Sequence, residues 1–207
     1  MKKEILLTSF LLLLTSIGLN SILAKDSIRG NYSLVGQIPS KNSLKKIIFE
    51  EFINFGCSHC NNLHKASKNF REKYSKNIDF IDIPITFHGQ NDSPLRLYFV
   101  AKKIGKADLV KDELFKARFE HGVNVFDVSV INYIARSLGI YEKFKMEKHK
   151  IWVNNLIENG KIKAEKYRIT GTPTIVIQNS IKMDISKYGS ISNFINKIPE
   201  TIEDLIK

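Results

Sequence analysis

The sequence is poor in the residues that cross-link or interrupt small proteins. Its 207 residues include two cysteines, five prolines and one tryptophan. Two cysteines cannot build the disulfide framework of a small secreted scaffold, and 43% hydrophobic residues can form a sizeable core. A disulfide-stapled miniprotein and a wholly disordered chain are therefore excluded. The length is that of one domain, or of one domain with an insertion.

Acidic residues are scarce relative to basic ones. The sequence has 21 Asp and Glu against 32 Lys and Arg, and its formal net charge is +11. It lacks an aromatic and basic motif for nucleic-acid binding, and most lysines fall on expected helix faces. We interpret the charge as a solvated surface with weak attraction to membrane surfaces, and we expect no nucleic-acid partner.

The sequence has one long apolar run, which lies near its N-terminus. Lys2 and Lys3 precede the apolar segment 5–14, small residues lead to Ala24, and charge resumes at Lys25. This order predicts a cleavable signal peptide over residues 1–24, and hence an exported, periplasmic protein. The alternative is an uncleaved membrane anchor, although Thr, Ser and Asn residues dilute the apolar run and favour cleavage.

The rest of the chain predicts an α/β fold. Residues 25–46 are polar and form a loose N-terminal lead-in. The β-branched and aromatic runs 47–55 and 78–87 predict two mostly buried strands. Between them, residues 57–74 have helical spacing, with a predicted buried face of Leu63, Ala66, Phe70 and Tyr74. Strand, helix and strand form one βαβ unit with parallel strands.

A helical insertion follows this unit. Ser93 and Pro94 supply an N-cap and a proline at the first helical position. Glycines, including the Asn159–Gly160 pair, separate the predicted helices over 95–104, 107–119, 127–138, 141–156 and 160–168. Two short strands then predict a β-hairpin, and an amphipathic helix capped by Ser190 closes the sequence; the strands cover 174–177 and 181–185.

The chemistry of the chain lies in Cys57-Ser58-His59-Cys60. A strand that ends at Gly56 and a helix that begins at Cys57 place the first sulfur at a helix N-terminus, where free N–H groups favour an anion. A protonated His59 adds a positive charge beside it. Cysteines in such positions have pKa values of about 3.5–7.5 instead of about 8.5. Cys60, one turn later, is more shielded and can act as the resolving thiol in dithiol–disulfide exchange.

Other interpretations of the cysteine pair fit less well. A structural disulfide at this spacing closes too small a loop to add much stability. A c-type haem site needs histidine directly after Cys60, where the chain has Asn61. A zinc site could recruit both cysteines, His59 and His64, but a second paired motif is lacking, so we expect neither metal nor cofactor. We interpret the scattered histidines as surface or helix residues rather than ligands: His64, His88, His121 and His149.

The chain resembles the DsbA family of secreted thiol:disulfide oxidoreductases. The resemblance rests on the run 49–60 (FEEFINFGCSHC), on the later Gly171-Thr172-Pro173-Thr174, and on the helical stretch between them. It implies a thioredoxin fold with an inserted helical domain. The fold would occupy residues 47–92 and 169–207, and the insertion residues 93–168.

The resemblance also implies roles for three residues outside the cysteine motif. Pro173 corresponds to a cis-proline that faces the active site, and Thr172 exposes its backbone to a substrate peptide. Glu51, six residues before Cys57, corresponds to a buried acid that assists proton movement at the resolving cysteine. Without the resemblance, Pro173 would be interpreted as a trans proline that begins a strand, and Glu51 equally well as a strand residue reaching solvent.

By resemblance, the chain is expected to be a monomeric oxidase that introduces disulfides into reduced or unfolded secreted proteins. A membrane partner of the DsbB type would reoxidise it. Ser58 and Thr172 depart from strong oxidases of the family, which often have Pro and Val at these positions, and Asp82 stands where a buried Lys might accompany the acid. A disulfide reductase or isomerase is therefore the first alternative, and a non-catalytic secreted chaperone or binding protein is the second.

Overall fold

The computed structural model describes residues 28–38 and 46–206. The predicted signal peptide, residues 1–24, lies outside the described residues, as do residues 25–27 and 39–45 of the predicted lead-in. Within the part that is described, every helix is too short or too polar to cross a membrane.

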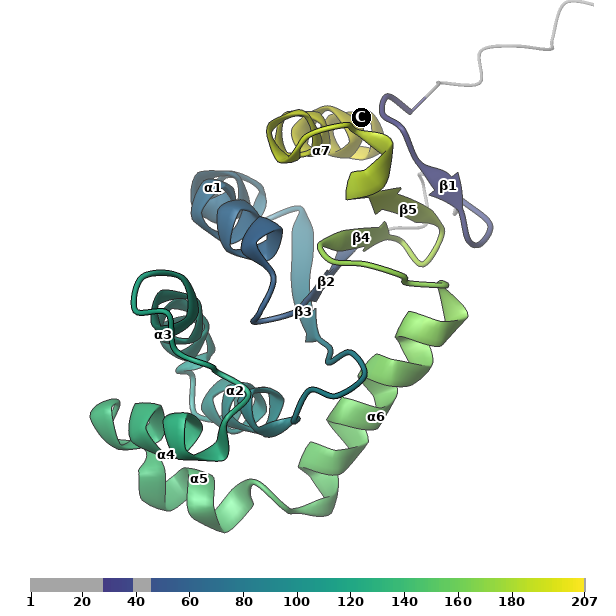
Figure 1. Ribbon diagram of the computed structural model, residues 1–207. Helices are drawn as coiled ribbons and strands as arrows, with labels where there is room; N and C mark the ends of the chain where they lie inside the picture. Colours follow the sequence, from purple (N-terminus) through teal and green to yellow (C-terminus); the bar gives the residue numbers. More distant parts are fainter. Residues whose placement is uncertain (1–27, 39–45, 207) are drawn as a thin grey trace, which may run out of the picture.

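A mixed five-stranded sheet forms the centre of the described structure, with strand order β1-β5-β4-β2-β3 (Figure 1). β2 and β3 are parallel, and the other neighbours are antiparallel. The parallel pair is joined by the helix between them, as the predicted βαβ unit requires. The strands are β1 (Ser33–Leu34), β2 (Ile47–Ile53), β3 (Ile78–Pro84), β4 (Thr174–Ile177) and β5 (Ile181–Asp184).

Strand β2, which lies between β4 and β3, is buried on both faces, which explains its nearly continuous apolar sequence. Phe49 points to the side covered by α1 (Ser58–Tyr74) and α7 (Ile191–Ile206). Phe52 points to the opposite side, where its ring packs edge-on against Tyr167 at a centroid distance of 6.0 Å. The strand therefore holds together both layers of the fold.

Helix α1 exposes Ala66, contrary to the sequence prediction. Its buried residues are Cys60, Asn61, Leu63, His64, Ser67 and Tyr74. Ser67 is 2% exposed and lies on the same face as Leu63 and Tyr74. The prediction followed apolar residues alone, whereas this face of α1 also packs against a polar and charged region of the molecule.

Five helices are inserted between β3 and β4 (Figure 1). The predicted break at Asn159–Gly160 is wrong, because the last of these helices runs through both residues. A Cβ at Gly160 would lie 3.4 Å from Ile83 Cγ2, so this glycine permits close packing of a helix against a strand. The break lies instead at residues 148–150. The inserted helices are α2 (Ser93–Lys103), α3 (Ala107–Phe119), α4 (Val128–Ser137), α5 (Tyr141–Glu147) and α6 (Ile151–Lys166).

The lead-in contains a strand that the sequence pattern did not predict. β1 pairs antiparallel with β5, with Ser33 opposite Lys182. The Val35 N–H also donates to the Ser180 carbonyl at 2.7 Å. A strand of two residues has no measurable periodicity, so tertiary pairing alone defines it. The predicted hairpin is confirmed, and its second strand ends at Asp184 before a 3₁₀ turn over 185–187.

The burial of α7 predicts which of its side chains stabilise the fold. Phe194 is completely buried against the sheet, whereas Ile206 on the same helix is 37% exposed. Phe194→Ala should lower the free energy of unfolding by about 3–5 kcal/mol. The matched control, Ile206→Ala, should lower it by less than about 1 kcal/mol. Denaturant titration followed by circular dichroism measures both, and equal losses would contradict the burial of this face.

Candidate active site

Cys57 is the N-cap residue of α1. Its backbone is extended, with φ −92° and ψ 117°, and its sulfur accepts a hydrogen bond from the Cys60 N–H at 3.3 Å. A helix N-terminus presents N–H groups that lack partners within the helix, and these groups stabilise negative charge. The side chain that performs the capping here is the proposed nucleophile. Both cysteines are free, with Cys57 partly exposed and Cys60 buried.

The surroundings lower the pKa of Cys57 to about 6. The Cys60 thiol contributes most by hydrogen bonding to the Cys57 sulfur. Burial opposes the shift, and the Thr172 hydroxyl and the backbone N–H groups of Cys60 and His59 add to it. At pH 7 this cysteine is therefore mainly a thiolate, the reactive form in disulfide exchange.

Cys60 has the opposite character. Its side chain is completely buried, and burial raises its pKa well above the ordinary value. The neighbouring Cys57 raises it further, while the backbone of Asn54 lowers it. The two sulfurs are thus one partly exposed thiolate and one shielded thiol, as the sequence motif predicted.

The two residues between the cysteines are exposed. The backbone N–H of His59 hydrogen-bonds to the Cys57 sulfur and thereby lowers the pKa of Cys57. Within residues 28–38 and 46–206, no three His, Cys, Asp or Glu side chains are grouped so that they could hold a metal ion.

The loop before β4 lies against Cys57. The Thr172–Pro173 peptide bond is cis, as the resemblance implied. The Cys57 thiol donates a hydrogen bond to the Thr172 carbonyl at 3.1 Å, and the Thr174 hydroxyl donates to the Gly171 carbonyl at 2.8 Å. Two segments 115 residues apart in sequence therefore meet at the reactive sulfur.

Asn54 supports the turn between β2 and α1, a role that the sequence prediction missed. It is 2% exposed, donates to the Ile85 carbonyl at 2.9 Å and to Gln90 Oε1 at 2.7 Å, and accepts from the Gly56 N–H at 2.9 Å. An asparagine two residues before a glycine is a common turn signal that could have indicated it. Gly56 has little space, because a Cβ there would lie 2.8 Å from the ring of Phe126.

Glu51 lies inside a buried ionic network. It is 1% exposed, as the resemblance implied, and its Oε2 accepts from Arg71 at 2.5 Å, so the alternative of a strand residue reaching solvent is wrong. Asp82, its neighbour on β3, accepts from Arg71 at 2.6 Å and from Lys111 at 2.8 Å. Tyr98 donates to the same aspartate at 3.3 Å. The sequence has Asp82 where a buried lysine might accompany the acid, and the cations of the network come instead from α1 and α3.

The network also sets the charge state of Asp82. Burial alone would raise the pKa of this carboxyl, but Lys111 and Arg71 together hold it far below its usual range. A buried carboxylate is tolerated here because two cations compensate for its lost hydration.

His64 is a helix residue, as the sequence suggested, but it is buried and has a charged partner. It is 8% exposed, and its Nε2 lies 2.5 Å from Asp112 Oδ1 on α3. Burial and Lys111 lower its pKa, outweighing the opposite effects of Asp112 and Glu51. The partner is 48 residues away in sequence, so inspection of nearby residues could not find it.

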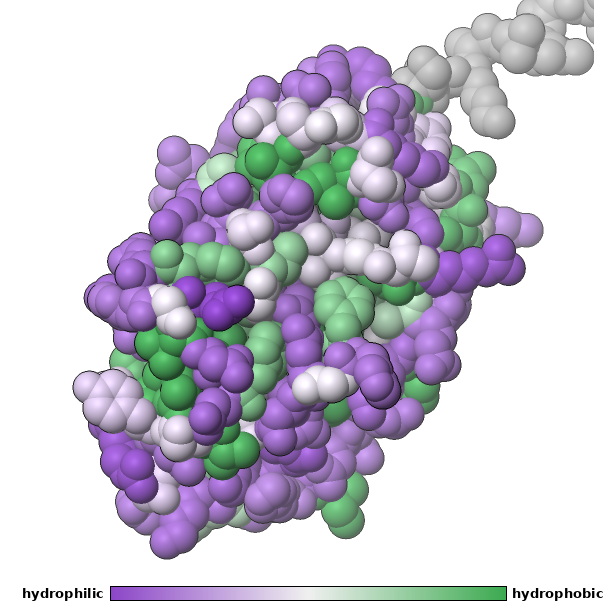
Figure 2. All heavy atoms as spheres, in the orientation of Figure 1, coloured by the Kyte–Doolittle hydropathy of each residue, from purple (hydrophilic) through white to green (hydrophobic). Residues whose placement is uncertain are grey.

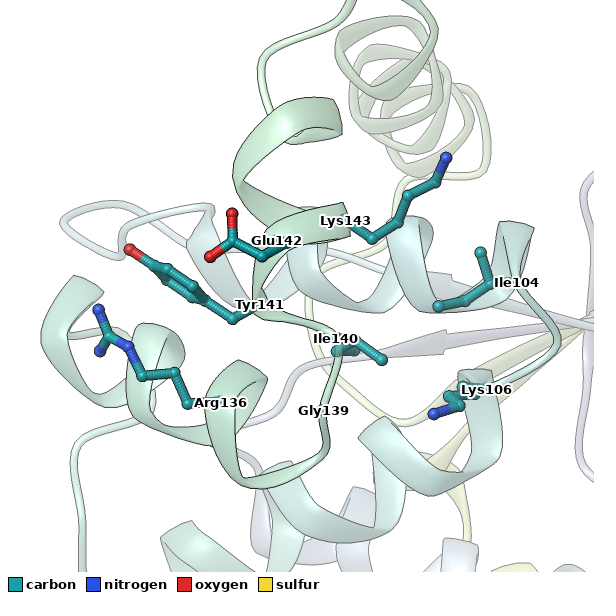
Figure 3. A pocket seen from close by; sticks show the side chains of 8 residues that line it. All are labelled: Ile104, Lys106, Arg136, Gly139, Ile140, Tyr141, Glu142 and Lys143. Atoms are coloured by element: carbon teal, nitrogen blue, oxygen red, sulfur yellow. The ribbon is translucent and has the colours of Figure 1, made fainter.

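A separate cavity of 590 Å³ lies in the helical insertion (Figure 3). Lys106 and Arg136 are among the residues that line it. The Arg136 guanidinium lies 4.0 Å from the centre of the Tyr141 ring. Neither cysteine lines this cavity, so it is distinct from the site at the start of α1.

The sheet order, the capping thiolate and the adjoining cis-proline loop define a thioredoxin-like dithiol protein. Residues 73–195 match the model of the DSBA-like thioredoxin domain, and the chain belongs to this family. It is a thiol:disulfide oxidoreductase.

The comparisons with individual proteins agree with this family. The thiol:disulfide interchange protein DsbA of Pseudomonas syringae pv. tomato is 25% identical over 145 residues, which cover 70% of this chain and 68% of the relative. DsbA of Burkholderia cepacia is 24% identical over 161 residues, or 77% and 73% of the two chains. The crystal structure of Pseudomonas aeruginosa DsbA matches with a TM-score of 0.70 at 20% identity, over 83% and 90% of the chains. The predicted thioredoxin fold with a helical insertion is confirmed.

The contacts of Cys57 predict its titration. The thiolate absorbance of the reduced protein should rise with an apparent pKa of about 6. Cys60→Ala removes the largest contribution to this shift, so the pKa of Cys57 should rise in that variant. An unchanged pKa in Cys60→Ala would show that the helix N-terminus alone stabilises the thiolate.

The hydrogen bonds of Asn54 predict a loss of stability on truncation. Asn54→Ala leaves the Ile85 carbonyl without this donor and should lower the free energy of unfolding by about 1–3 kcal/mol. Asn62→Ala, at an exposed position of α1, is the control and should change it by less than about 0.5 kcal/mol. Urea titration compares the two variants, and similar small changes would refute a supporting role for Asn54.

Proposed function

We propose that this oxidoreductase is an exported dithiol oxidase that introduces disulfides into reduced secreted proteins. The observation that carries the proposal is the asymmetry of the two thiols. Cys57 is a partly exposed thiolate with a pKa of about 6, and Cys60 is a buried thiol with a raised pKa. A stabilised thiolate favours the reduced form, so the oxidised form readily accepts electrons from a substrate.

The proposed reaction has two exchange steps at Cys57. A substrate thiolate attacks the Cys57 sulfur of the Cys57–Cys60 disulfide, a bond forms between substrate and Cys57, and Cys60 leaves and takes up a proton. A second substrate thiolate then attacks the substrate sulfur of this mixed disulfide. Cys57 leaves as a thiolate, and its low pKa makes it a good leaving group.

Substrate recognition is proposed to use the cis-proline loop and the apolar surface next to it. Thr172 lies beside Cys57, where its backbone can pair with an extended peptide. Phe126 packs against Gly56, and Figure 2 shows apolar side chains gathered over α3 and α4 on the visible face. The groove between these two helices is lined in part by Ala117, Val123, Val130 and Ile134.

A solved relative supports peptide binding by this fold. The complex of Proteus mirabilis DsbA with a non-covalently bound peptide matches this chain with a TM-score of 0.66 at 19% identity, over 85% of this chain and 96% of that one. We infer that reduced, unfolded polypeptides are the substrates here as well. Pro173 would shape the loop that receives them.

We propose supporting roles for Glu51 and His59. Glu51 is buried and one of its oxygens, Oε1, has no protein partner within the described residues. A buried carboxylate oxygen of this kind binds water or a proton donor. Glu51 could therefore assist the movement of a proton to or from Cys60. His59 is exposed beside Cys57 and would favour the thiolate when protonated.

The proposal includes the compartment and the partner. The N-terminal sequence supports export to the periplasm, where the enzyme would act as a monomer. The reduced Cys57–Cys60 pair needs reoxidation, and a membrane protein of the DsbB type has the required chemistry. The helical insertion, residues 93–168, would be the second domain beside the thioredoxin fold.

The redox potential tests the direction of the reaction. Deprotonation of a cysteine with a pKa of about 6 stabilises the reduced protein at pH 7 by about 1.4 kcal/mol, or about 30 mV. We expect the Cys57–Cys60 couple to be at least about 20 mV more oxidising than thioredoxin, whose potential is about −270 mV. Equilibration with glutathione buffers and thiol trapping measures this value.

A potential at or below that of thioredoxin would identify a reductase instead of an oxidase. A second experiment tests whether the protein acts through Cys57 at all. Oxidation of a reduced, unfolded substrate should be lost in Cys57→Ala. Full retention of biological function in that variant would instead identify a non-catalytic binding protein.

A further inference from the structure

The proposed reaction requires Cys60 to exchange a proton although its side chain has no contact with solvent. Cys60 is 0% exposed and burial raises its pKa. When the reduced protein is reoxidised, Cys57 first forms a mixed disulfide, and the Cys60 thiol must lose its proton before it can attack. The following inference rests on this proposed function and concerns how that proton reaches solvent, in addition to the assistance proposed for Glu51.

His64 is placed to receive the proton. It follows Cys60 by one helical turn on the buried face of α1. Helical side chains lean toward the N-terminus, so the imidazole leans toward the turn that carries Cys60. Its ring packs on Phe115 at 5.4 Å, and Phe115 packs on Phe55, in the same core cluster as Cys60, at 5.6 Å. Residues one turn apart are about 5–6 Å apart at Cβ, a separation that one water molecule can bridge.

Asp112 orients the imidazole for this role. Its carboxylate lies 2.5 Å from His64 Nε2 and accepts the Nε2–H. The neutral ring then carries its proton on Nε2 and leaves the lone pair of Nδ1 free to accept another. A carboxylate that selects the tautomer of a histidine base in this way is a recurrent arrangement in enzymes.

A cleft of 290 Å³ connects this histidine to solvent. His64 and Ser67 lie along its α1 wall, and Asp112, 49% exposed at its side chain, lies on the α3 wall. The charged groups that face His64 come from three elements: Lys68 and Arg71 on α1, Asp108, Lys111 and Asp112 on α3, and Glu51 on β2.

These charges favour release of a captured proton. Burial and Lys111 lower the pKa of His64, which favours the neutral imidazole over the imidazolium at neutral pH. Asp112 and Lys68, which are 3.2 Å apart, stand at the exposed side of the cleft. A proton that reaches His64 therefore has a polar path to water.

We propose that His64 is the positioning residue that relays the proton of Cys60 to solvent, with Asp112 as its orienting partner. In the resolving step the Cys60 thiol gives its proton through one water molecule to His64 Nδ1. The Cys60 sulfur attacks Cys57, the Cys57–Cys60 bond forms, and the bond from Cys57 to the partner sulfur breaks. The partner leaves as a thiolate, and His64 passes the proton to water in the cleft.

The test measures the resolving step by itself. Reduced full-length protein is mixed with excess oxidised glutathione, quenched with acid at intervals, and analysed by mass spectrometry for the Cys57–glutathione intermediate. His64→Gln keeps a donor for Asp112 but cannot accept a proton. We expect intramolecular release of glutathione to be at least tenfold slower at pH 7 in this variant, and the inflection due to His64 to vanish from its profile between pH 5 and 8.

Two further variants separate the relay from a structural effect. Asp112→Asn removes the charge that raises the pKa of His64, so the inflection should move to lower pH. His149→Gln removes an exposed histidine between α5 and α6 and should match the wild-type rate within twofold. In all three variants, the rate of the initial attack by Cys57 on oxidised glutathione should remain within twofold of the wild-type rate. The acid dissociation constant of the Cys57 thiol should also remain within twofold of the wild-type value.

The outcomes distinguish the relay from the function on which it rests. A wild-type intermediate that Cys60 never resolves would overturn the dithiol function itself. Resolution by His64→Gln within twofold of wild type, with the same pH profile, would overturn the relay alone. If His64→Gln does not fold, Asp112→Asn decides, and an unmoved inflection in that variant would overturn the relay.

Discussion

The hydrogen bond from the Cys60 N–H to the Cys57 sulfur, at 3.3 Å, is the contact around which this site is built. It makes the sulfur the cap of α1, so the N–H groups that begin the helix stabilise a thiolate instead of binding water. The turn supported by Asn54 aligns the helix with the end of β2, and Gly56 permits the close approach of Phe126. The reactivity of Cys57 follows from this alignment, and the burial of Cys60 on the same turn creates the asymmetry between the two thiols.

The same helix joins the sheet to the helical insertion through buried charge. Arg71, on α1, bridges Glu51 of β2 and Asp82 of β3, and Lys111 of α3 completes the network. Breaking such a network leaves an uncompensated buried charge, which costs several kcal/mol. The insertion is consequently bound to the thioredoxin-like sheet by a constraint that apolar packing alone would not impose. It also brings Asp112 to His64, which follows the buried Cys60 by one turn of α1.

Much of the fold could be predicted from local pattern. The strands around 47–53 and 78–84, the helix between them and the later hairpin were all anticipated, because apolar runs and turn residues specify them locally. The errors arose where packing overrides these signals. Gly160 resembled a helix end but permits contact with Ile83, and Ser67 was overlooked because buried polar residues do not contribute to an apolar stripe. β1 exists only through its pairing with β5.

The sequence by itself determined the reactive group: two cysteines one turn apart at the start of a helix, with a Thr-Pro pair to follow. Those features are local, since strand, turn and cap are specified by neighbouring residues. Only the tertiary structure decided that Cys60 is completely buried, that Thr172 lies at Cys57, and that Asp112 lies at His64. These contacts join segments 115 and 48 residues apart, and burial and pairing over such separations arise only when the sheet and the inserted helices pack together.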